Sequence, residues 1–398
     1  MATPDCDLPA NATVAEVGEQ AIIDWIRRVA PPAPPEIVTG IGDDAAVLDR
    51  VQNHLAVVTT DSLVEEVHFR RPWSTPSDVG AKALLVNLSD LAAMGATPHA
   101  ALLSLGLPAT LSVAALVALV AAFIDVARAN RMGLVGGNIS LSPGPLFVDV
   151  TAIGAAKRRK LLYRHGARVG DSLYVTGSLG GAAAGLLWLQ RTSALERTDS
   201  WLAGVESPFA PAEGRAGLQA EPLTHLEPAV APALQRYFRP DVRSRIGQSV
   251  GRARAARACV DLSDGLADAL RQMASASGIG VEIDAEAIPV DASAREVASR
   301  LGADPLTLAL SGGEDYELLF AVSQRSTRRF LATVAGAGRV PVTRIGRVLP
   351  PVVLDLVRNG RTEQLPGGFR HFADASSELL PTAHRGRGWG RPGLLPAL

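Results

Sequence analysis

The chain has 398 residues, a length that allows two domains with a hydrophobic core each. Its 39 Lys and Arg residues are balanced by 40 Asp and Glu residues, and the net charge of −1 gives no general attraction to nucleic acid or to a membrane surface. Two cysteines, Cys6 and Cys259, are too few for a disulfide framework or a cysteine-based metal cluster. Any affinity for phosphate groups must therefore come from a local site.

The first part of the sequence predicts an α+β half. Its start has neither the basic residues nor the apolar stretch of a signal peptide, so we expect a cytoplasmic protein. The apolar run 111–124 is shorter than the ~20 residues of a membrane span and predicts a buried helix. The elements expected here are a helix over 14–29 that ends at a proline-rich stretch, a strand over 54–60, a helix over 78–95, a helix over 111–129 and a strand over 146–153.

The second part of the sequence begins with the basic connector 157–166. The segment 191–232 is rich in Ser, Pro, Glu, Gly and Ala and has little periodicity, which is typical of an insertion or a partly disordered surface loop. The elements expected around it are a strand over 172–175, a glycine-rich turn followed by an alanine-rich helix, a strand–turn–helix unit over 259–273, the segment 311–322 and a final strand over 344–348. Cys259 lies in an apolar stretch and is expected to be a small buried side chain.

Acidic residues in apolar, glycine-rich and turn-forming contexts are the unusual feature of this sequence. Carboxylates about 4 Å apart repel one another by a few kcal/mol at an effective dielectric constant near 20, so a site built from them needs cations. Oxygen ligands without His or Cys favour Mg²⁺, which commonly binds together with phosphates. The residues concerned are Asp43, Asp44, Asp61, Asp90, Asp261, Asp264, Glu314 and Asp315.

Each acidic motif alone also has an ordinary structural explanation. Asp43 and Asp44 beside a glycine are typical of a turn. Ser263 and Asp264 before a helix are typical of an N-cap, and Asp90 can be solvated on a helix surface. No single motif decides between these explanations and a metal site.

The turn 177–181 is a weak candidate for phosphate binding. It follows a strand and precedes a helix, where free backbone N–H groups can bind an anion. Close packing of the helix on the strand is the more common reason for such glycines, because the later parts of a dinucleotide-binding fingerprint are missing. Neither a GxxxxGK[ST] loop nor a protein-kinase catalytic loop occurs in the sequence.

Seven motifs together resemble the thiamine-monophosphate kinase family, in the order in which that family carries them. They are GIGDDAAVL, TTDSLVEEVHF, AKALLVNLSDLAAMGATP, VGGN, RHGARVGDSLYVTGSLGGAAAGL, VDLSDGLADAL and ALSGGEDYELLFAV. The match covers about residues 37–372 apart from 191–232. This resemblance implies an α/β (α+β) fold with two domains, like that of aminoimidazole ribonucleotide synthetase, and a homodimer.

The resemblance and the expected elements together divide the chain into four parts. These are an N-terminal helix with a proline-rich linker over 1–36, an ATP- and magnesium-binding domain with a mixed sheet and helices over 37–156, a C-terminal α/β domain over 157–372 that contains the 191–232 insertion, and a flexible tail over 373–398.

The resemblance also implies roles for individual residues. The positions that match magnesium ligands, some of them through backbone oxygens, are Asp44, Thr59, Thr60, Asp61, Asp90, Asp261 and Asp264, and of these Asp61, Asp90 and Asp264 are expected to carry catalysis. The positions that match nucleotide contacts are Gly137, Asn138, Arg164 and Ser263. The positions that match thiamine-phosphate contacts are His68, Glu314 and Phe369. One departure is Asn138, where the family usually has an Asp that binds magnesium, so the number of metal ions is left open.

The expected function is phosphorylation of thiamine monophosphate to thiamine diphosphate by ATP, with Mg²⁺ as cofactor and no nucleic-acid or membrane partner. A phosphate oxygen is already anionic near neutral pH, so in-line attack on the γ-phosphorus needs no strong base, and catalysis is positioning plus charge neutralisation. Two alternatives remain. One is another ATP-using enzyme of the same superfamily with a different acceptor, and the other is a nucleotide- or thiamine-phosphate-binding protein that lost turnover with the change to Asn138.

Overall fold

The computed structural model describes residues 8–32, 34–41, 45–49, 52–192, 201, 227–351 and 353–367. Among the residues expected to form the site, Asp44 and Phe369 lie outside these ranges, as do the tail 373–398 and most of the 191–232 segment.

The N-terminal half is built around a four-stranded sheet in the order β3-β6-β4-β5. Its elements are α1 (Val14–Val17), α2 (Glu19–Val29), β1 (Ile37–Thr39), β2 (Val47–Leu48), β3 (His54–Val64), α3 (Pro76–Ala93), β4 (Thr97–Leu107), α4 (Val113–Ala129), β5 (Gly133–Leu141), β6 (Phe147–Lys157) and the 3₁₀ turn η1 (Arg158–Lys160). The prediction of one helix over 14–29 is wrong in one respect. Gly18, at a φ of 81°, interrupts it and separates α1 from α2.

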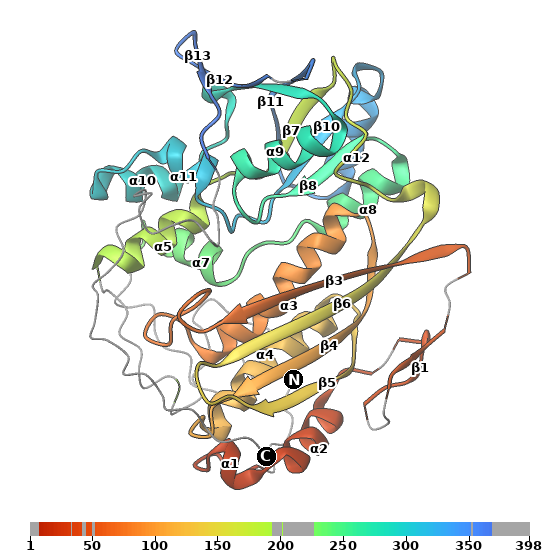
Figure 1. Ribbon diagram of the computed structural model, residues 1–398, viewed down its shortest axis with the longest axis vertical. Coiled ribbons are helices and arrows are strands. Elements are labelled where there is room, and N and C mark those ends of the chain that lie inside the picture. The colour runs from red at the N-terminus through yellow and green to blue at the C-terminus, as the bar shows by residue number, and fades with distance from the viewer. Residues whose placement is uncertain are drawn as a thin grey trace, which may run out of the picture.

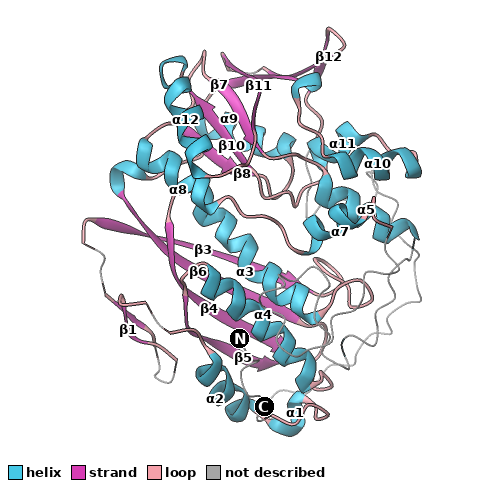
Figure 2. Cartoon of the chain, turned by 180° about the vertical axis from the view of Figure 1, so that it is seen from behind, coloured by secondary structure: helices cyan, strands magenta, loops and turns pink. Residues whose placement is uncertain are grey.

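Two helices, α3 and α4, cover one face of the four-stranded sheet, while the other face has no described helix over it (Figures 1 and 2). Helix α3 begins with a capping box between Thr75 and Asp78, with Pro76 at its first turn. It is buried almost all round because it packs on the sheet, on α4 and on the C-terminal half. A Cβ at Gly80 would lie 1.9 Å from the carbonyl oxygen of Leu119, so glycine is what allows α3 and α4 to approach this closely.

The C-terminal half contains a seven-stranded sheet in the order β13-β12-β9-β11-β7-β10-β8. Its elements are β7 (Ser172–Thr176), α5 (Gly181–Thr192), α7 (Ala231–Phe238), α8 (Ser244–Ala253), β8 (Ala258–Asp261), α9 (Leu266–Ser277), β9 (Gly280–Asp284), η4 (Ala285–Ala287), α10 (Ala292–Leu301), α11 (Pro305–Ser311), β10 (Leu318–Val322), η5 (Gln324–Ser326), α12 (Thr327–Ala337), β11 (Val342–Leu349), β12 (Leu354–Arg358) and β13 (Arg361–Gln364).

Two separate hydrophobic clusters cover the two faces of this seven-stranded sheet. Alternate strand residues point to opposite faces. In β10, Leu319 packs in the cluster that contains α9, whereas Phe320 packs in the cluster that contains α8 and α12. Cys259 of β8 belongs to the second cluster and is a buried free thiol, which confirms its expected structural role.

The two halves together confirm the expected two-domain α/β fold, with one large sheet in each half and a small sheet of β1 and β2 in the N-terminal half. The prediction missed the hairpin of β12 and β13, although its turn carries the Asn359-Gly360 pair in which both residues have positive φ. Within the described ranges, no helix combines the length and the apolar character needed to cross a membrane.

Trp201 is the one residue between 193 and 226 that the structure describes. Its side chain is buried, stacks on Phe69 with ring centroids 6.2 Å apart, and donates from Nε1 to the carbonyl oxygen of Ser74 at 2.8 Å. The Ser112 hydroxyl donates to the Trp201 carbonyl oxygen at 2.6 Å. At this residue the expectation of a surface loop is wrong, because a single aromatic side chain anchors the chain in the N-terminal core. The composition of the whole segment conceals that anchor.

Candidate active site

The acidic motifs meet where the two halves join. Thr59 and Asp61 lie on the face of β3 that α3 covers, and the Thr59 hydroxyl donates to the carboxylate of Asp90 on α3. Next to Asp90, the Ser89 hydroxyl donates at 2.8 Å to Asp261, the last residue of β8. Strand β3, helix α3 and strand β8 therefore bring the carboxylates of Asp61, Asp90 and Asp261 close together.

Asp61, Asp90 and Asp261 form the acidic group of this site, and their pKa shifts indicate that the group lacks sufficient positive charge nearby. Burial, reinforced by the charges of Asp90 and Asp261, raises the pKa of Asp61 to about 7. Burial, followed by the charge of Asp90, likewise raises the pKa of Asp261 to about 7, and burial raises the pKa of Asp90. The exposed Arg164 guanidinium acts in the opposite direction on the pKa of Asp90 and of Asp261. A cation would relieve the remaining repulsion.

These residues fit a hard divalent cation such as Mg²⁺. All donors are oxygen atoms, and the carboxylates are too close to be ionised together without compensation. In the part of the chain that the structure describes, no three His, Cys, Asp or Glu side chains form a ready-made set of metal ligands. A cation would draw the mutually repelling carboxylates together, and Asp44 lies outside the described residues.

The loop after β8 connects the acidic group to the segment 312–317. The carbonyl oxygen of Ser263 accepts from the N–H of Glu314 at 2.6 Å, and that of Leu262 accepts from Tyr316 at 3.0 Å. The Ser263 hydroxyl lies 3.5 Å from the Asp264 carboxylate. The N-cap of α9 is Gly265 rather than either of these two residues, so the N-cap interpretation of Ser263 and Asp264 is wrong.

The glycine turn 177–181 binds a carboxylate of the chain itself. Asp315 accepts hydrogen bonds from the N–H of Gly180 at 2.7 Å and of Ala182 at 3.4 Å, at the start of α5. Burial nevertheless raises the pKa of Asp315 to about 7. A Cβ at Gly180 would lie 2.8 Å from the backbone nitrogen of Ala309. Gly180 thus allows a close approach, but to α11 rather than of the following helix to the strand, and this helix terminus is occupied by Asp315.

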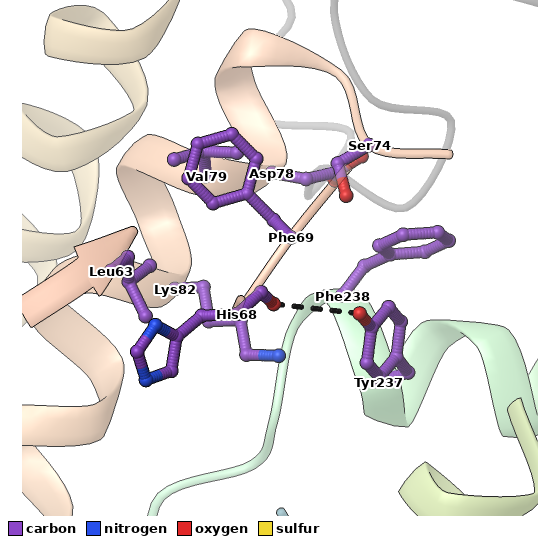
Figure 3. A pocket seen from close by; sticks show the side chains of 9 residues that line it. All are labelled: Leu63, His68, Phe69, Ser74, Asp78, Val79, Lys82, Tyr237 and Phe238. Carbon is purple, nitrogen blue, oxygen red and sulfur yellow. Dashed lines mark hydrogen bonds between the residues drawn. The ribbon is translucent and has the colours of Figure 1, made fainter. Parts of the chain in front are cut away.

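A small pocket lies beside the acidic group, between α3 and α7 (Figure 3). His68 and Lys82 line it from the N-terminal half and Tyr237 lines it from the C-terminal half. The Lys82 ammonium donates to Glu314 at 2.9 Å, and the Tyr237 hydroxyl donates to the His68 carbonyl oxygen at 3.5 Å. Burial raises the pKa of Tyr237, so this hydroxyl stays protonated. His68 thus lines the pocket, and Glu314, far from it in the sequence, is connected to the pocket through Lys82.

Tyr316 is a buried residue close to the carboxylates of Glu314 and of the acidic group. Its pKa is raised, first by burial and then by the charges of Glu314, Asp61 and Asp261. One side chain therefore senses the carboxylates of both places, which makes them parts of one site.

Three of the expected site residues do not join this group. Asn138 on β5 pairs through Ser104 and Asp149 with Ser62, and directly paired strand residues share a face, so Asn138 faces away from Asp61. It lies across the full sheet, about 14 Å from β3 at the usual strand spacing. Its amide donates to Ser140 at 2.8 Å. The side chain of Thr60 lies on the same outward face, and Gly137 is on β5, at the far edge from β3.

Four residues of the site were missed by sequence reasoning, namely Lys82, Ser89, Tyr237 and Tyr316. Lys82 had one signal, a single charge inside the apolar stretch of α3. Ser89 had another, since Leu-Ser-Asp occurs at 88–90 and again at 262–264. In the structure Ser89 of the first triplet bonds to Asp261, immediately before the second triplet.

Comparisons with known proteins agree with this architecture. The family described as AIR synthase related protein, N-terminal domain, matches residues 42–156, and its C-terminal domain matches residues 238–357. A thiamine-monophosphate kinase of Rhodopirellula baltica is 32% identical over 362 residues, which are 89% of this chain and 97% of the relative.

Two solved structures are similar over most of their length. The thiamine-monophosphate kinase from Stenotrophomonas maltophilia K279a has a TM-score of 0.67 and 35% identity, covering 83% of this chain and 93% of that one. The structure of AaThiL complexed with AMPPCP and TMP has a TM-score of 0.65 and 31% identity, covering 90% and 98%. The chain therefore belongs to the thiamine-monophosphate kinase family.

Proposed function

We propose that the protein transfers the γ-phosphoryl group of ATP to thiamine monophosphate and so forms thiamine diphosphate and ADP. The observation that carries this proposal is the meeting of Asp61, Asp90 and Asp261, together with a nearby pocket that His68 and Lys82 line and whose lysine pairs with Glu314. Relatives named as thiamine-monophosphate kinases, and the complex of one similar structure with AMPPCP and TMP, support the same donor and acceptor.

The proposed phosphoryl transfer does not require a strong general base, because the attacking phosphate oxygen is already anionic near neutral pH. A phosphate oxygen of the acceptor forms the new bond to the γ-phosphorus while the bond from that phosphorus to the β–γ bridging oxygen breaks, and ADP leaves with that electron pair. Arg164 is the exposed cation next to the acidic group and is placed to bind phosphate oxygens. His68 would orient the acceptor from the neighbouring pocket, and Glu314 would do so from beside Lys82.

Magnesium belongs to this proposal. Thr59, Asp61, Asp90, Asp261 and Asp264 would hold it, and when bound it would neutralise the charge of the transferring phosphoryl group. The carboxylates of the chain would fix the position of the magnesium ion relative to Arg164 and the pocket.

A homodimer is proposed as the working form. The outward face of the four-stranded sheet exposes Val58 and Phe147, which are 61% and 37% accessible, and no described helix covers it. Such an exposed apolar surface is typical of a protein contact. The cytoplasmic location stays a prediction from the sequence.

A coupled assay on the purified full chain tests the proposed function. It combines ATP, Mg²⁺ and thiamine monophosphate, measures thiamine diphosphate and ADP together, and uses thiamine as a control acceptor. Equal amounts of both products support the kinase. Turnover of ATP only with another phosphorylated acceptor would favour a different enzyme of the superfamily.

The binding-protein alternative has its own discriminator. It requires tight binding of ATP and thiamine monophosphate without product over a range of Mg²⁺ concentrations. A rise in turnover by orders of magnitude in Asn138→Asp would also support this alternative. Because Asn138 lies across the sheet from Asp61 and on its opposite face, we expect no such increase within one chain.

A further inference from the structure

One face of α3 carries a stripe of three polar residues that bond to the C-terminal half. Asp78, Lys82 and Ser89 fall within about 40° of one another around the helix at 100° per residue. Asp78 pairs with Arg239 at 3.2 Å, Lys82 with Glu314 at 2.9 Å and Ser89 with Asp261 at 2.8 Å. All three are buried, so the stripe is a polar seam inside the molecule.

Lys82 differs from the other two because it lines the pocket and its partner, Glu314, is an expected contact of the acceptor. The Lys82 ammonium also lies 4.2 Å from the centroid of the Tyr237 ring, in a cation–π contact. The Lys82 side chain is 6% exposed, whereas that of Glu314 is 26% exposed. The lysine is therefore fixed on two sides, and the carboxylate it holds remains partly exposed to solvent.

Only one of the two carboxylate oxygens of Glu314 accepts a hydrogen bond among the described residues. Lys82 binds Oε2, and among the described residues no hydrogen bond to Oε1 is found. The backbone of Glu314 has a φ of 60°, a conformation that costs a non-glycine residue free energy and that clusters at functional sites. Its N–H bonds to the Ser263 carbonyl oxygen at 2.6 Å, next to the acidic group.

We propose that Lys82 is a positioning residue for the phosphoryl acceptor. It holds Glu314 through Oε2 so that Oε1 faces the acceptor and accepts a hydrogen bond from an amino group there. This inference rests on the proposed function, which makes thiamine monophosphate the acceptor, a molecule that offers an amino group and a cationic ring to a carboxylate.

Stability alone does not account for this arrangement. A buried ion pair is often no more stabilising than apolar residues of the same volume, because both charges must be removed from water. Here the carboxylate belongs to a non-glycine residue at positive φ and stays 26% exposed although its partner is buried. Both features are expected when orientation of Glu314 is the purpose of the pair.

The test compares Lys82→Met with Lys82→Arg in the full chain, by steady-state kinetics with each substrate varied in turn. We expect Lys82→Met to raise KM for thiamine monophosphate at least about tenfold and KM for ATP less than about twofold, and Lys82→Arg to restore part of the loss. Adding Lys82→Met to Glu314→Gln should change the acceptor KM less than about twofold, because Lys82 acts through Glu314. Melting temperatures identify a variant that does not fold, and Lys82→Gln then replaces Lys82→Met in the same comparison.

Arg239→Met is the matched control, because it breaks another buried ion pair of the same stripe without touching Glu314. We expect it to lower stability and to leave the acceptor KM within about twofold. An unchanged acceptor KM in Lys82→Met, or an equal rise in Arg239→Met, would overturn the inference while the kinase stands. A wild-type chain that forms no thiamine diphosphate would instead overturn the proposed function, and the inference with it.

Discussion

Single side chains decide the chemistry of this site, and Asp61 is the clearest case. It lies at the end of β3 on the covered face of the sheet, and its pKa is raised to about 7 by burial and by Asp90 and Asp261. Its hydrogen-bond partner is another carboxylate, that of Asp90, which does not compensate its charge. Asp61 is suited to a site that is completed by a cation and a phosphate.

Replacing Asp61 by Asn should abolish most of the activity. The amide keeps the volume and loses the charge, so we expect kcat/KM to fall about a hundredfold or more while the chain stays folded, as measured by kinase assay and circular dichroism. Asp125→Asn is the control. Asp125 forms an exposed pair with Arg128 at 2.7 Å on α4, and its loss should change kcat/KM less than about twofold. Activity of Asp61→Asn near that of the wild type would remove Asp61 from the mechanism.

At the scale of elements, buried ionic contacts fix the long loops of the C-terminal half. Glu317 is fully buried, accepts from Arg243 and from the Thr176 hydroxyl at 2.6 Å each, and so ties α8 to β7 and β10. The rest of the segment 314–317 is also fixed, Glu314 by its ion pair with Lys82 and Asp315 and Tyr316 by hydrogen bonds to backbone groups. Its geometry therefore depends on partners that are far away in the sequence.

Breaking the Glu317 contact should destabilise the protein strongly. In Glu317→Gln the buried Arg243 loses its counter-charge, and we expect a decrease of about 3–5 kcal/mol in the free energy of unfolding, measured with urea. Arg347→Met, which removes an exposed pair with Glu282, should cost at most about 1 kcal/mol. Equal decreases in the free energy of unfolding for the two variants would contradict the expectation that the buried pair stabilises the protein more than the exposed one.

Trp201 gives a second prediction at this scale. Its ring is buried against Phe69, and the Arg71 guanidinium lies 5.0 Å from the ring centroid. Trp201→Ala should lower the free energy of unfolding by about 3–5 kcal/mol, as expected for loss of a large buried aromatic. Trp188→Ala on α5, where the side chain is only partly buried, is the comparison and should cost less. A neutral Trp201→Ala would show that the anchor is dispensable.

The elements could be predicted largely from sequence because their signals are local. Apolar periodicity placed α3 and α4, and proline placed the end of α2. The hairpin at Asn359-Gly360 was missed although its turn signal was present. For the site, the motifs predicted the carboxylates, but Lys82 and Glu314 are 232 residues apart, and no local pattern predicts a contact of that kind.

For the whole molecule, the acidic group links stability to pH and to metal. The pKa of Asp61 and of Asp261 is about 7 in the folded chain, against the usual value of 3.8 that applies when the chain is unfolded. Between these values the folded chain binds more protons, so stability without metal should fall as the pH rises from about 4 to about 7. The pKa of Asp315 is also raised to about 7, so Asp315 contributes to the same decrease, but its carboxylate binds at the start of α5 and not in the acidic group.

Magnesium should reverse this decrease, because it replaces the protons that the carboxylates otherwise retain. We expect the rise in Tm on adding Mg²⁺ to be small at pH 5 and larger at pH 8, measured by thermal unfolding against NaCl of equal ionic strength. Asp61→Asn should reduce the Mg²⁺-dependent part. A rise that is the same at both pH values, or the same in Asp61→Asn, would contradict a magnesium site at these residues.

The contact of Asp315 with the start of α5 has a consequence for inhibitor design. A carboxylate that is part of the chain competes at an effective concentration in the millimolar range or above, whereas a free phosphate compound must compete from solution. Gly180 and Ala182 therefore present their N–H groups to a tethered competitor. Phosphate mimics designed for that glycine turn would have to displace it first, and compounds directed at Arg164 would not.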